Sequence, residues 1–97
     1  MNFGKVLGTV VSTQKNDGMQ GKRYLLVQSC QPNGDLLNEF HVAIDLVGSG
    51  YGEMVLISQG SSARQTRDTY QKAVDCVIIG IVDLVEGNNQ FLYRKNK

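Results

Sequence analysis

Short strand-like segments, separated by turns that contain glycine, constrain the fold of this chain most strongly. The clearest segment is Glu39–Val47, in which apolar and polar side chains alternate. Its apolar members are Phe40, Val42, Ile44 and Leu46. Such a regular period of two implies a β-strand with one core face and one more polar face.

Four further segments have the β-branched and apolar composition of strands. Asp-Gly and Asn-Gly pairs, which tolerate the positive φ of tight turns, lie within residues 15–18 and 32–35. Phe91–Tyr93 is expected to add a short edge strand. The four strand segments are Phe3–Thr13, Arg23–Gln31, Glu53–Gln59 and Cys76–Val85.

The connections between these segments indicate an all-β fold. The polar segment Gln65–Val74 is predicted to form one short helix or loop, which a serine of the preceding Gly60–Arg64 loop would cap. Five main strands with hairpin-type links are typical of a small closed or partly closed barrel of OB-like type. A chain of 97 residues fits one domain with a modest core, so contacts between subunits would add stability.

The composition argues against nucleic-acid and membrane partners. The formal net charge is +1, and the basic cluster Arg94–Lys97 is expected to be a solubilising chain end. No stretch approaches the ~20 apolar residues of a membrane span. The first residues have neither the apolar region nor the cleavage pattern of a secretion signal. The protein is therefore expected to stay in the cytosol.

Few side chains are suited to hold a metal ion. Cys30 and Cys76 are far apart and form no CxxC motif, so in a reducing compartment we expect two buried small hydrophobes. With the lone His41 they offer too few ligands for zinc. The carboxylates near strand ends lack EF-hand spacing, and no metal or cofactor is expected. These carboxylates are Asp45, Glu53, Asp75 and Asp83.

A catalytic site is not expected either. Ser61 or Ser62 with His41 and Asp45 would supply the residue types of a hydrolytic triad. The chain has no GxSxG elbow, which presents the nucleophilic serine in one large class of hydrolases. His41 lies on the polar face of its strand, where a solvated or interface histidine is the ordinary outcome. We therefore predict that the protein is not an enzyme.

The glycine-rich loop Gly48–Gly52 leaves one alternative open. Successive backbone N–H groups of such a loop can form an anion-binding nest. A strand rather than a helix follows the loop, however, and the GK[ST] of a phosphate-binding P-loop is missing. A sharp turn between strands is favoured. The alternative is an OB-like binding module for nucleic acid or a small anion, although the aromatic residues do not gather on one strand face.

Five pieces of the sequence, taken together and in order, identify a resemblance. Gly60–Arg64 reads GSSAR and matches a family motif in full. The other pieces are Gly4–Val11, Gly21–Gln28, Val42–Leu56 and Val74–Asp83. In register over residues 3–85, the chain resembles the EutN/CcmL family of bacterial microcompartment shell proteins. It departs from the family pattern at Ser49, where alanine is common, and at Ala73, where a proline often precedes the last core strand.

The resemblance implies a structural role. Proteins of this family form five-stranded barrels that assemble as cyclic pentamers and fill the vertices of polyhedral shells, beside hexameric shell proteins. The expected organisation is a single domain over residues 1–97, with a core at 3–85 and a C-terminal tail at 86–97. The expected location is the microcompartment shell in the bacterial cytoplasm, and the expected partners are four further copies and the hexameric tiles.

Two loops are the candidate sites of subunit contact. Glycines let backbones approach closely, and serine and arginine side chains can bond between chains. Gly80 interrupts an apolar strand, as glycines do at bulges, and structural roles are expected for it, Asp45 and Asp83. The residues expected at a subunit interface or near the axis are Gly48, Ser49, Gly50, Gly52, Glu53, Gly60, Ser61, Ser62 and Arg64.

Overall fold

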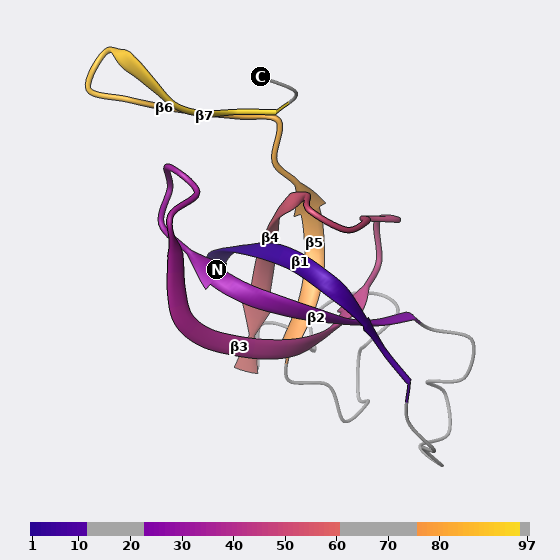
Figure 1. Ribbon diagram of the computed structural model, residues 1–97. Helices are drawn as coiled ribbons and strands as arrows, with labels where there is room; N and C mark the ends of the chain where they lie inside the picture. The colour runs from indigo at the N-terminus through magenta and orange to yellow at the C-terminus, as the bar shows by residue number, and fades with distance from the viewer. Residues whose placement is uncertain (12–22, 61–75, 96–97) are drawn as a thin grey trace.

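Residues 1–11, 23–60 and 76–95 are described by a computed structural model of the chain. These residues form a barrel and a separate two-stranded hairpin (Figure 1). Within them no helix is long and apolar enough to cross a membrane. The strands are β1 (Asn2–Val10), β2 (Arg23–Cys30), β3 (Leu36–Asp45), β4 (Met54–Gln59), β5 (Cys76–Ile81), β6 (Leu84–Gly87) and β7 (Gln90–Arg94).

Five strands close into the barrel in the order β1-β2-β3-β5-β4. All neighbouring pairs are antiparallel except β3 and β5, which run parallel where Ile44 pairs with Val77. Closure leaves no unpaired strand edge in the barrel. The predicted all-β class and five-stranded barrel are confirmed, and the predicted helical segment Gln65–Val74 lies outside the described residues.

Small and β-branched side chains fill the interior of the barrel. Ala43, Val55 and Ile57 are fully buried there, because alternate residues of each strand point inward. Both cysteines are buried, as predicted. The central cluster consists of Val6, Leu25, Val27, Ala43, Val55, Ile57, Cys76 and Ile78.

The strand with the most regular alternation does not bury its apolar residues in the way its pattern suggests. In β3, Phe40 and Val42 are each 52% exposed, whereas Ala43 is fully buried in the central cluster. The odd-numbered, more polar set therefore faces the interior. A five-stranded barrel has a narrow interior, which Ala43 fits and a phenylalanine does not. On the outer face of β3, Phe40 and Val42 stay in solvent, whereas Ile44 is 3% exposed and packs with Val77 in a second cluster.

The chain leaves the barrel after β5 and forms a hairpin. The predicted strand Cys76–Val85 is wrong as one element, because it breaks at Val82 and Asp83 into β5 and β6. The predicted edge strand Phe91–Tyr93 is present within β7. Asn88 and Asn89 connect β6 and β7 with φ of 52° and 61°, as a two-residue type I′ turn requires.

Candidate functional site: the glycine loop and the outer face of the barrel

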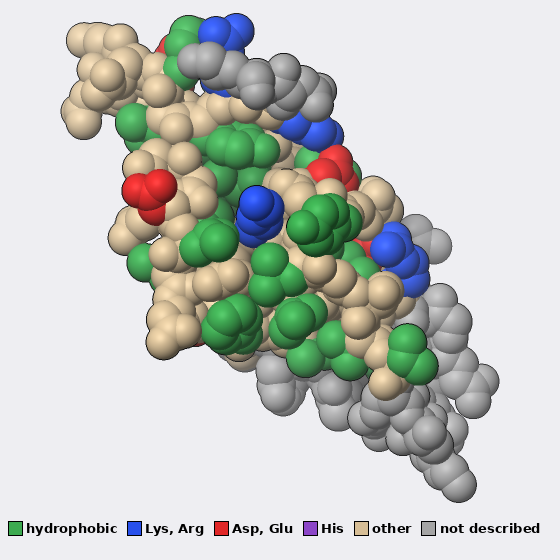
Figure 2. Space-filling model, viewed as in Figure 1, with side chains coloured by type: hydrophobic (Ala, Val, Ile, Leu, Met, Phe, Trp, Pro, Cys, Tyr) green, Lys and Arg blue, Asp and Glu red, His purple; other side chains and the backbone are tan. Residues whose placement is uncertain are grey.

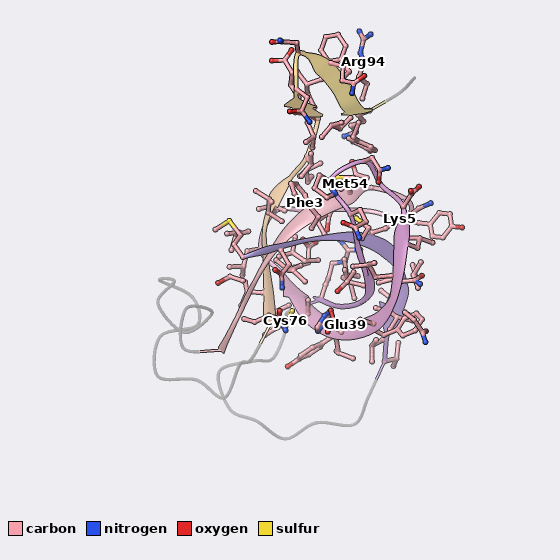
Figure 3. The ribbon with its side chains drawn as sticks, turned by 90° about the vertical axis from the view of Figure 1, so that its left-hand side faces the viewer. Phe3, Lys5, Glu39, Met54, Cys76 and Arg94 are labelled. Carbon is pink, nitrogen blue, oxygen red and sulfur yellow. The ribbon has the colours of Figure 1, made fainter. Side chains whose placement is uncertain are left out.

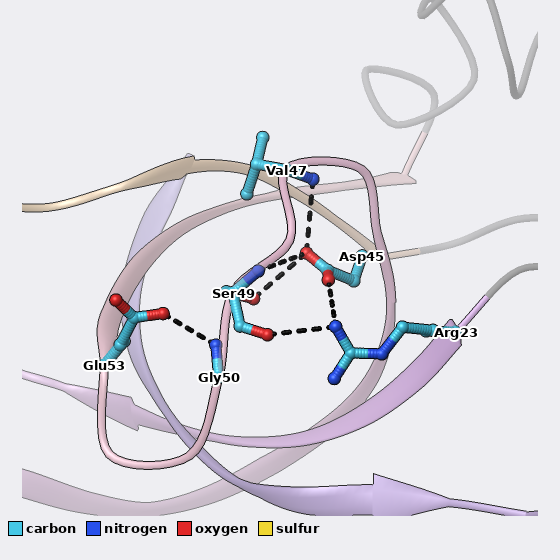
Figure 4. Close-up of polar contacts among 6 residues, drawn as sticks. All are labelled: Arg23, Asp45, Val47, Ser49, Gly50 and Glu53. Carbon is cyan, nitrogen blue, oxygen red and sulfur yellow. Dashed lines mark hydrogen bonds and ion pairs between the residues drawn. The ribbon is translucent and has the colours of Figure 1, made fainter.

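The carboxylate of Asp45 holds one side of the loop 48–52 (Figure 4). Its Oδ1 accepts hydrogen bonds from the backbone N–H of Val47 at 3.2 Å, the N–H of Ser49 at 3.2 Å and the Ser49 hydroxyl at 3.0 Å. Its Oδ2 pairs with Nη1 of Arg23 at 3.0 Å, and the same nitrogen donates to the Ser49 carbonyl oxygen at 3.2 Å. The Asp45 side chain is only 1% exposed, so these donors replace the water that it gives up.

Glu53 holds the other side of the loop (Figure 4). Its Oε1 accepts a hydrogen bond from the backbone N–H of Gly50 at 2.6 Å, and its Oε2 pairs with Nζ of Lys95 at 2.7 Å. The hydrogen bonds from Lys95 and Gly50 lower the pKa of the Glu53 carboxyl below its usual value. The hydrogen bond to Glu53 correspondingly raises the pKa of Lys95.

Backbone hydrogen bonds fasten the loop to β1. The N–H of Gly52 donates to the Val6 carbonyl at 2.9 Å, and the N–H of Val6 donates to the Glu53 carbonyl at 3.0 Å. Gly48 and Gly52 have φ of 78° and 82°, a region that other residues rarely adopt. Because several N–H groups already donate within the chain, the loop offers few donors to an anion. Tyr51 projects from its tip and is 81% exposed.

A second polar cluster lies at one end of the barrel interior. The Ser29 hydroxyl donates to Oε1 of Glu39 at 2.8 Å and lies 3.0 Å from Nε2 of His41. Nδ1 of His41 faces Nε2 of Gln59 at 3.3 Å rather than a carboxylate. Hydrogen bonds from Ser29 and His41 lower the pKa of Glu39. A triad needs its carboxylate at the second imidazole nitrogen, so this cluster is not arranged as one.

Sequence reasoning missed Ser29, because its partners are ten and twelve residues away along the chain. Strand periodicity could have indicated Ser29. It lies two residues after buried Val27 in β2, and its side chain points to the same side of the strand. His41 and Asp45, considered together as triad members, belong to separate hydrogen-bond networks. Within the described residues, no three histidine, cysteine, aspartate or glutamate side chains group as metal ligands.

The predicted site residues divide into three sets. Ser49 is 1% exposed, and with Gly50 and Glu53 it binds within its own chain. Gly60 follows β4 with φ of 64°, and Ser61, Ser62 and Arg64 lie outside the described residues. The expected structural residues are Asp45, described above, and Gly80 and Asp83.

Gly80 lies beside a register shift inside β5, and Asp83 lies between β5 and β6. The register between β4 and β5 shifts beside Gly80, because Leu56 pairs with Gly80 while the next residue, Ile57, pairs with Ile78. This is the kind of bulge expected of a glycine in a strand. The carbonyl oxygen of Asp83 accepts a hydrogen bond from the N–H of Lys95 at 3.0 Å, which closes the base of the hairpin.

The outer face of the barrel carries exposed apolar side chains on β3, and hydrophobic side chains gather on the face that Figure 2 shows. On β3 they are Leu36, Leu37, Phe40 and Val42. The register places Lys5 opposite Gln28 and Gln28 opposite Phe40, so these residues form one row across three strands. Exposed apolar side chains such as Phe40 and Val42, beside polar side chains such as Lys5 and Gln28, favour an interaction surface on this face.

Comparisons with known proteins agree with one another. Residues 1–83 match the family model described as ethanolamine utilisation protein EutN/carboxysome. The carboxysome shell vertex protein CcmL of Synechococcus elongatus is 45% identical over 97 residues, covering 100% of this chain and 98% of that protein. The structure of CcmL from Gloeobacter violaceus has a TM-score of 0.93 at 45% identity, and the match covers 100% of both chains.

A relative from another type of compartment shows the same fold. The pentameric microcompartment shell protein GrpN of Rhodospirillum rubrum has a TM-score of 0.81 at 42% identity, covering 90% of this chain and 99% of GrpN. The relatives are named shell vertex proteins, which supports the predicted shell function over the binding-module alternative. The predicted location in a shell within the bacterial cytoplasm is confirmed in the same way. The chain belongs to the EutN/CcmL family of bacterial microcompartment shell proteins.

Proposed function

We propose that this protein forms a homopentamer that closes the vertices of a bacterial microcompartment shell, beside hexameric shell proteins of the same compartment. A sheet of hexagonal tiles stays flat, and pentagons supply the curvature that closes it. A head-to-tail contact repeated with a rotation of about 72° closes a ring of five. Relatives of 42–45% identity with solved structures that include a pentameric shell protein support this proposal.

The observation that carries the proposal is the apolar outer face of β3. Phe40 and Val42 are each 52% exposed in the isolated chain, and Leu36 and Leu37 of the same strand are exposed as well. Removing such side chains from water contributes about 25 cal/mol per Å² of apolar area. A stable interface needs roughly 1,000 Å² or more of buried surface, which a contact centred on this face would help to supply.

The proposed role is structural, without catalysis or a cofactor, and without nucleic acid or membrane as a partner. The relatives are named for their place in a shell. The hydrogen bonds around Asp45 and Glu53 serve to hold the 48–52 loop. This loop and the Gly60–Arg64 loop are proposed to lie at subunit contacts or near the five-fold axis. Tyr51 is the exposed side chain that the first loop contributes there.

The function is tested by assembling a shell with and without this chain. A hexameric shell protein from the same genome is expressed alone or together with this protein, and the products are imaged by electron microscopy. Sheets or tubes are expected from the hexamer alone, and closed polyhedral particles that contain this chain are expected from the pair. Closed particles of equal number in both preparations, or particles that lack the chain, would contradict the proposal.

A further inference from the structure

The turn between β2 and β3 has a defined geometry. The N–H of Gly34 donates to the Gln31 carbonyl at 2.8 Å, and the N–H of Gln31 donates to the Asp35 carbonyl at 2.8 Å. Pro32 fixes φ at the second position of the turn, and the positive φ of 96° falls on Gly34 and not on Asn33. These are the features of a type I turn followed by a glycine bulge, a common hairpin connection.

The pair Asn33-Gly34 in this turn can react with itself. The backbone nitrogen of Gly34 attacks Cγ of Asn33, the bond from Cγ to the side-chain nitrogen breaks, and ammonia leaves with the proton of the Gly34 N–H. The five-membered succinimide that forms is then opened by one water. Opening at the main-chain carbonyl gives isoaspartate, and opening at the former side-chain carbonyl gives aspartate. Glycine favours this reaction because it has no side chain beside the attacking nitrogen.

The backbone of the folded turn opposes the attack. The Gly34 nitrogen must give up its proton to attack, and in the turn this N–H donates to the Gln31 carbonyl. Ring closure also requires the Gly34 nitrogen to lie over Cβ of Asn33. At the third position of a type I turn ψ is about 0°, so this nitrogen eclipses the Asn33 nitrogen instead and must rotate by roughly a third of a turn.

The side chain of Asn33 is held as well. Its Oδ1 accepts a hydrogen bond from the backbone N–H of Asp35 at 3.0 Å, and its Nδ2 donates to Oδ2 of Asp35 at 3.1 Å. Asn33 itself is exposed, so water reaches it once the turn opens. An opening must break these contacts together with the turn hydrogen bond, so the reactive conformation is a minor state of the folded protein.

The turn lies against the base of the C-terminal arm formed by β6 and β7. A methyl group built on Gly34 would lie 3.6 Å from Cδ1 of Tyr93 and 3.7 Å from Cε of Met54. Met54 lies at the end of the barrel from which the arm projects, and the turn is at the same end (Figures 1 and 3). Cys30, the last residue of β2, belongs with Met54 to the cluster on which Tyr93 packs. A change in the turn therefore reaches the support of the arm.

We propose that Asn33 is a site of spontaneous deamidation whose rate is governed by opening of the β2–β3 turn, and that its conversion to isoaspartate loosens the C-terminal arm. Isoaspartate adds one carbon atom to the main chain of the turn. It also replaces an amide that donates to the Asp35 carboxylate by a second carboxylate, which repels it. Modified chains would then accumulate where the turn has opened. This chemistry does not depend on the proposed vertex function.

The rate of deamidation in the folded and unfolded chain tests the role of the turn. The purified protein is incubated at mildly alkaline pH with and without guanidinium chloride, and the products at position 33 are quantified by peptide mass spectrometry. The folded chain is expected to react more slowly by a factor of about ten or more, since a minor open state limits the reaction. Equal rates would show that the turn does not protect Asn33. Absence of product in the unfolded chain would exclude the site.

Pro32→Ala tests whether the turn opens by itself. The substitution frees φ at the second position and raises the population of open forms, so deamidation of the folded variant should be severalfold faster than that of the wild type. Gly4→Ala is the control, because its methyl group would collide with Val27 and disturb the barrel without changing a residue of the turn. Equal acceleration in both variants would assign the reaction to unfolding of the barrel and overturn the local gate.

Hydrogen exchange tests the effect on the arm. The isoaspartyl form is enriched by ion exchange, and exchange of the backbone amides in residues 84–94 is compared with that of the unmodified chain. Faster exchange is expected in these residues. Asn33→Asp is the matched control, since it supplies the charge without lengthening the main chain and should accelerate exchange less. Unchanged exchange of the arm in the isoaspartyl form would overturn the proposed loosening.

Discussion

At the scale of single residues, the side chains of the glycine loop hold its shape. Asp45 collects donors from Val47, Ser49 and Arg23 and is almost completely buried, so each missing donor leaves a charged acceptor less satisfied. The sequence predicted a structural role for Asp45 but not its partners Arg23 and Ser49, because the fold of the loop brings them together.

Ser49→Ala is expected to lower the free energy of unfolding by about 1.5–3 kcal/mol, the value of one hydrogen bond to a charged group. Chemical denaturation of the variant, of Asp45→Asn and of the double variant measures this cost and the coupling between the two side chains. Additive effects of the two substitutions would show that the hydroxyl does not act through Asp45.

The Glu53–Lys95 pair makes stability depend on pH in a defined direction. The folded pKa of Glu53 lies below its ordinary 4.5, so its contribution is complete above that value and disappears as pH falls through the lowered pKa. The folded pKa of Lys95 lies above 10.5, so its contribution is complete below that value and disappears as pH rises through the raised pKa.

Thermal unfolding of the wild type and Glu53→Gln across pH tests this pair. The wild type should be the more stable protein between these limits, and the difference should shrink in acid, where Glu53 is protonated. A difference that stays constant from neutral pH into acid would contradict the role assigned to the pair.

At the scale of elements, the sequence predicted where the strands lie along the chain. It did not predict which face of a strand points into the barrel. Alternation located β3, but both sides of that strand carry apolar residues, and the narrow barrel takes Ala43 rather than Phe40 inside. The break at Val82 and Asp83 was missed because the apolar run continues through it. Contacts such as that of Glu53 with Lys95 join residues 42 positions apart, which local patterns do not contain.

Two glycines of β1 test the packing of the barrel. A methyl group at Gly4 would collide with Cγ1 of Val27 and lie 3.3 Å from the carbonyl oxygen of Gln28. Gly4→Ala is therefore expected to cost about 1–3 kcal/mol of stability, as overpacking of a core does.

Gly8→Ala is the matched control for Gly4→Ala. It lies in the same strand, and its new methyl group would meet no atom within 4 Å. A change within about 0.5 kcal/mol is expected there. Equal effects of the two substitutions in denaturant unfolding would contradict the described register of β1 and β2.

At the scale of the whole molecule, a substitution on the outer face of β3 can test assembly without disturbing folding. Phe40 is exposed in the single chain, so Phe40→Asp should leave the barrel folded while shifting the protein from pentamers toward monomers. Val11→Asp is the control, since Val11 is more exposed and lies outside the face. Sedimentation and circular dichroism measure assembly and folding separately. Pentamers of undiminished population in Phe40→Asp would exclude the β3 face as the main contact.

The family resemblance predicted the assembly of the protein, which physical reasoning about a single chain could not predict. Periodicity and turns predicted a small barrel, whereas the pentamer and the vertex followed from motifs such as Gly60–Arg64 read together. The arm formed by β6 and β7 was not foreseen, because the tail after residue 85 carries no distinctive motif.

The most direct measurement is the mass of the unmodified protein in solution, determined by native mass spectrometry at several concentrations. One chain has a mass of 10.7 kDa, so a pentamer has about five times that, close to 54 kDa. A dominant species at this mass over a wide range of concentration is the result that the vertex account predicts. A stable monomer at high concentration would contradict it.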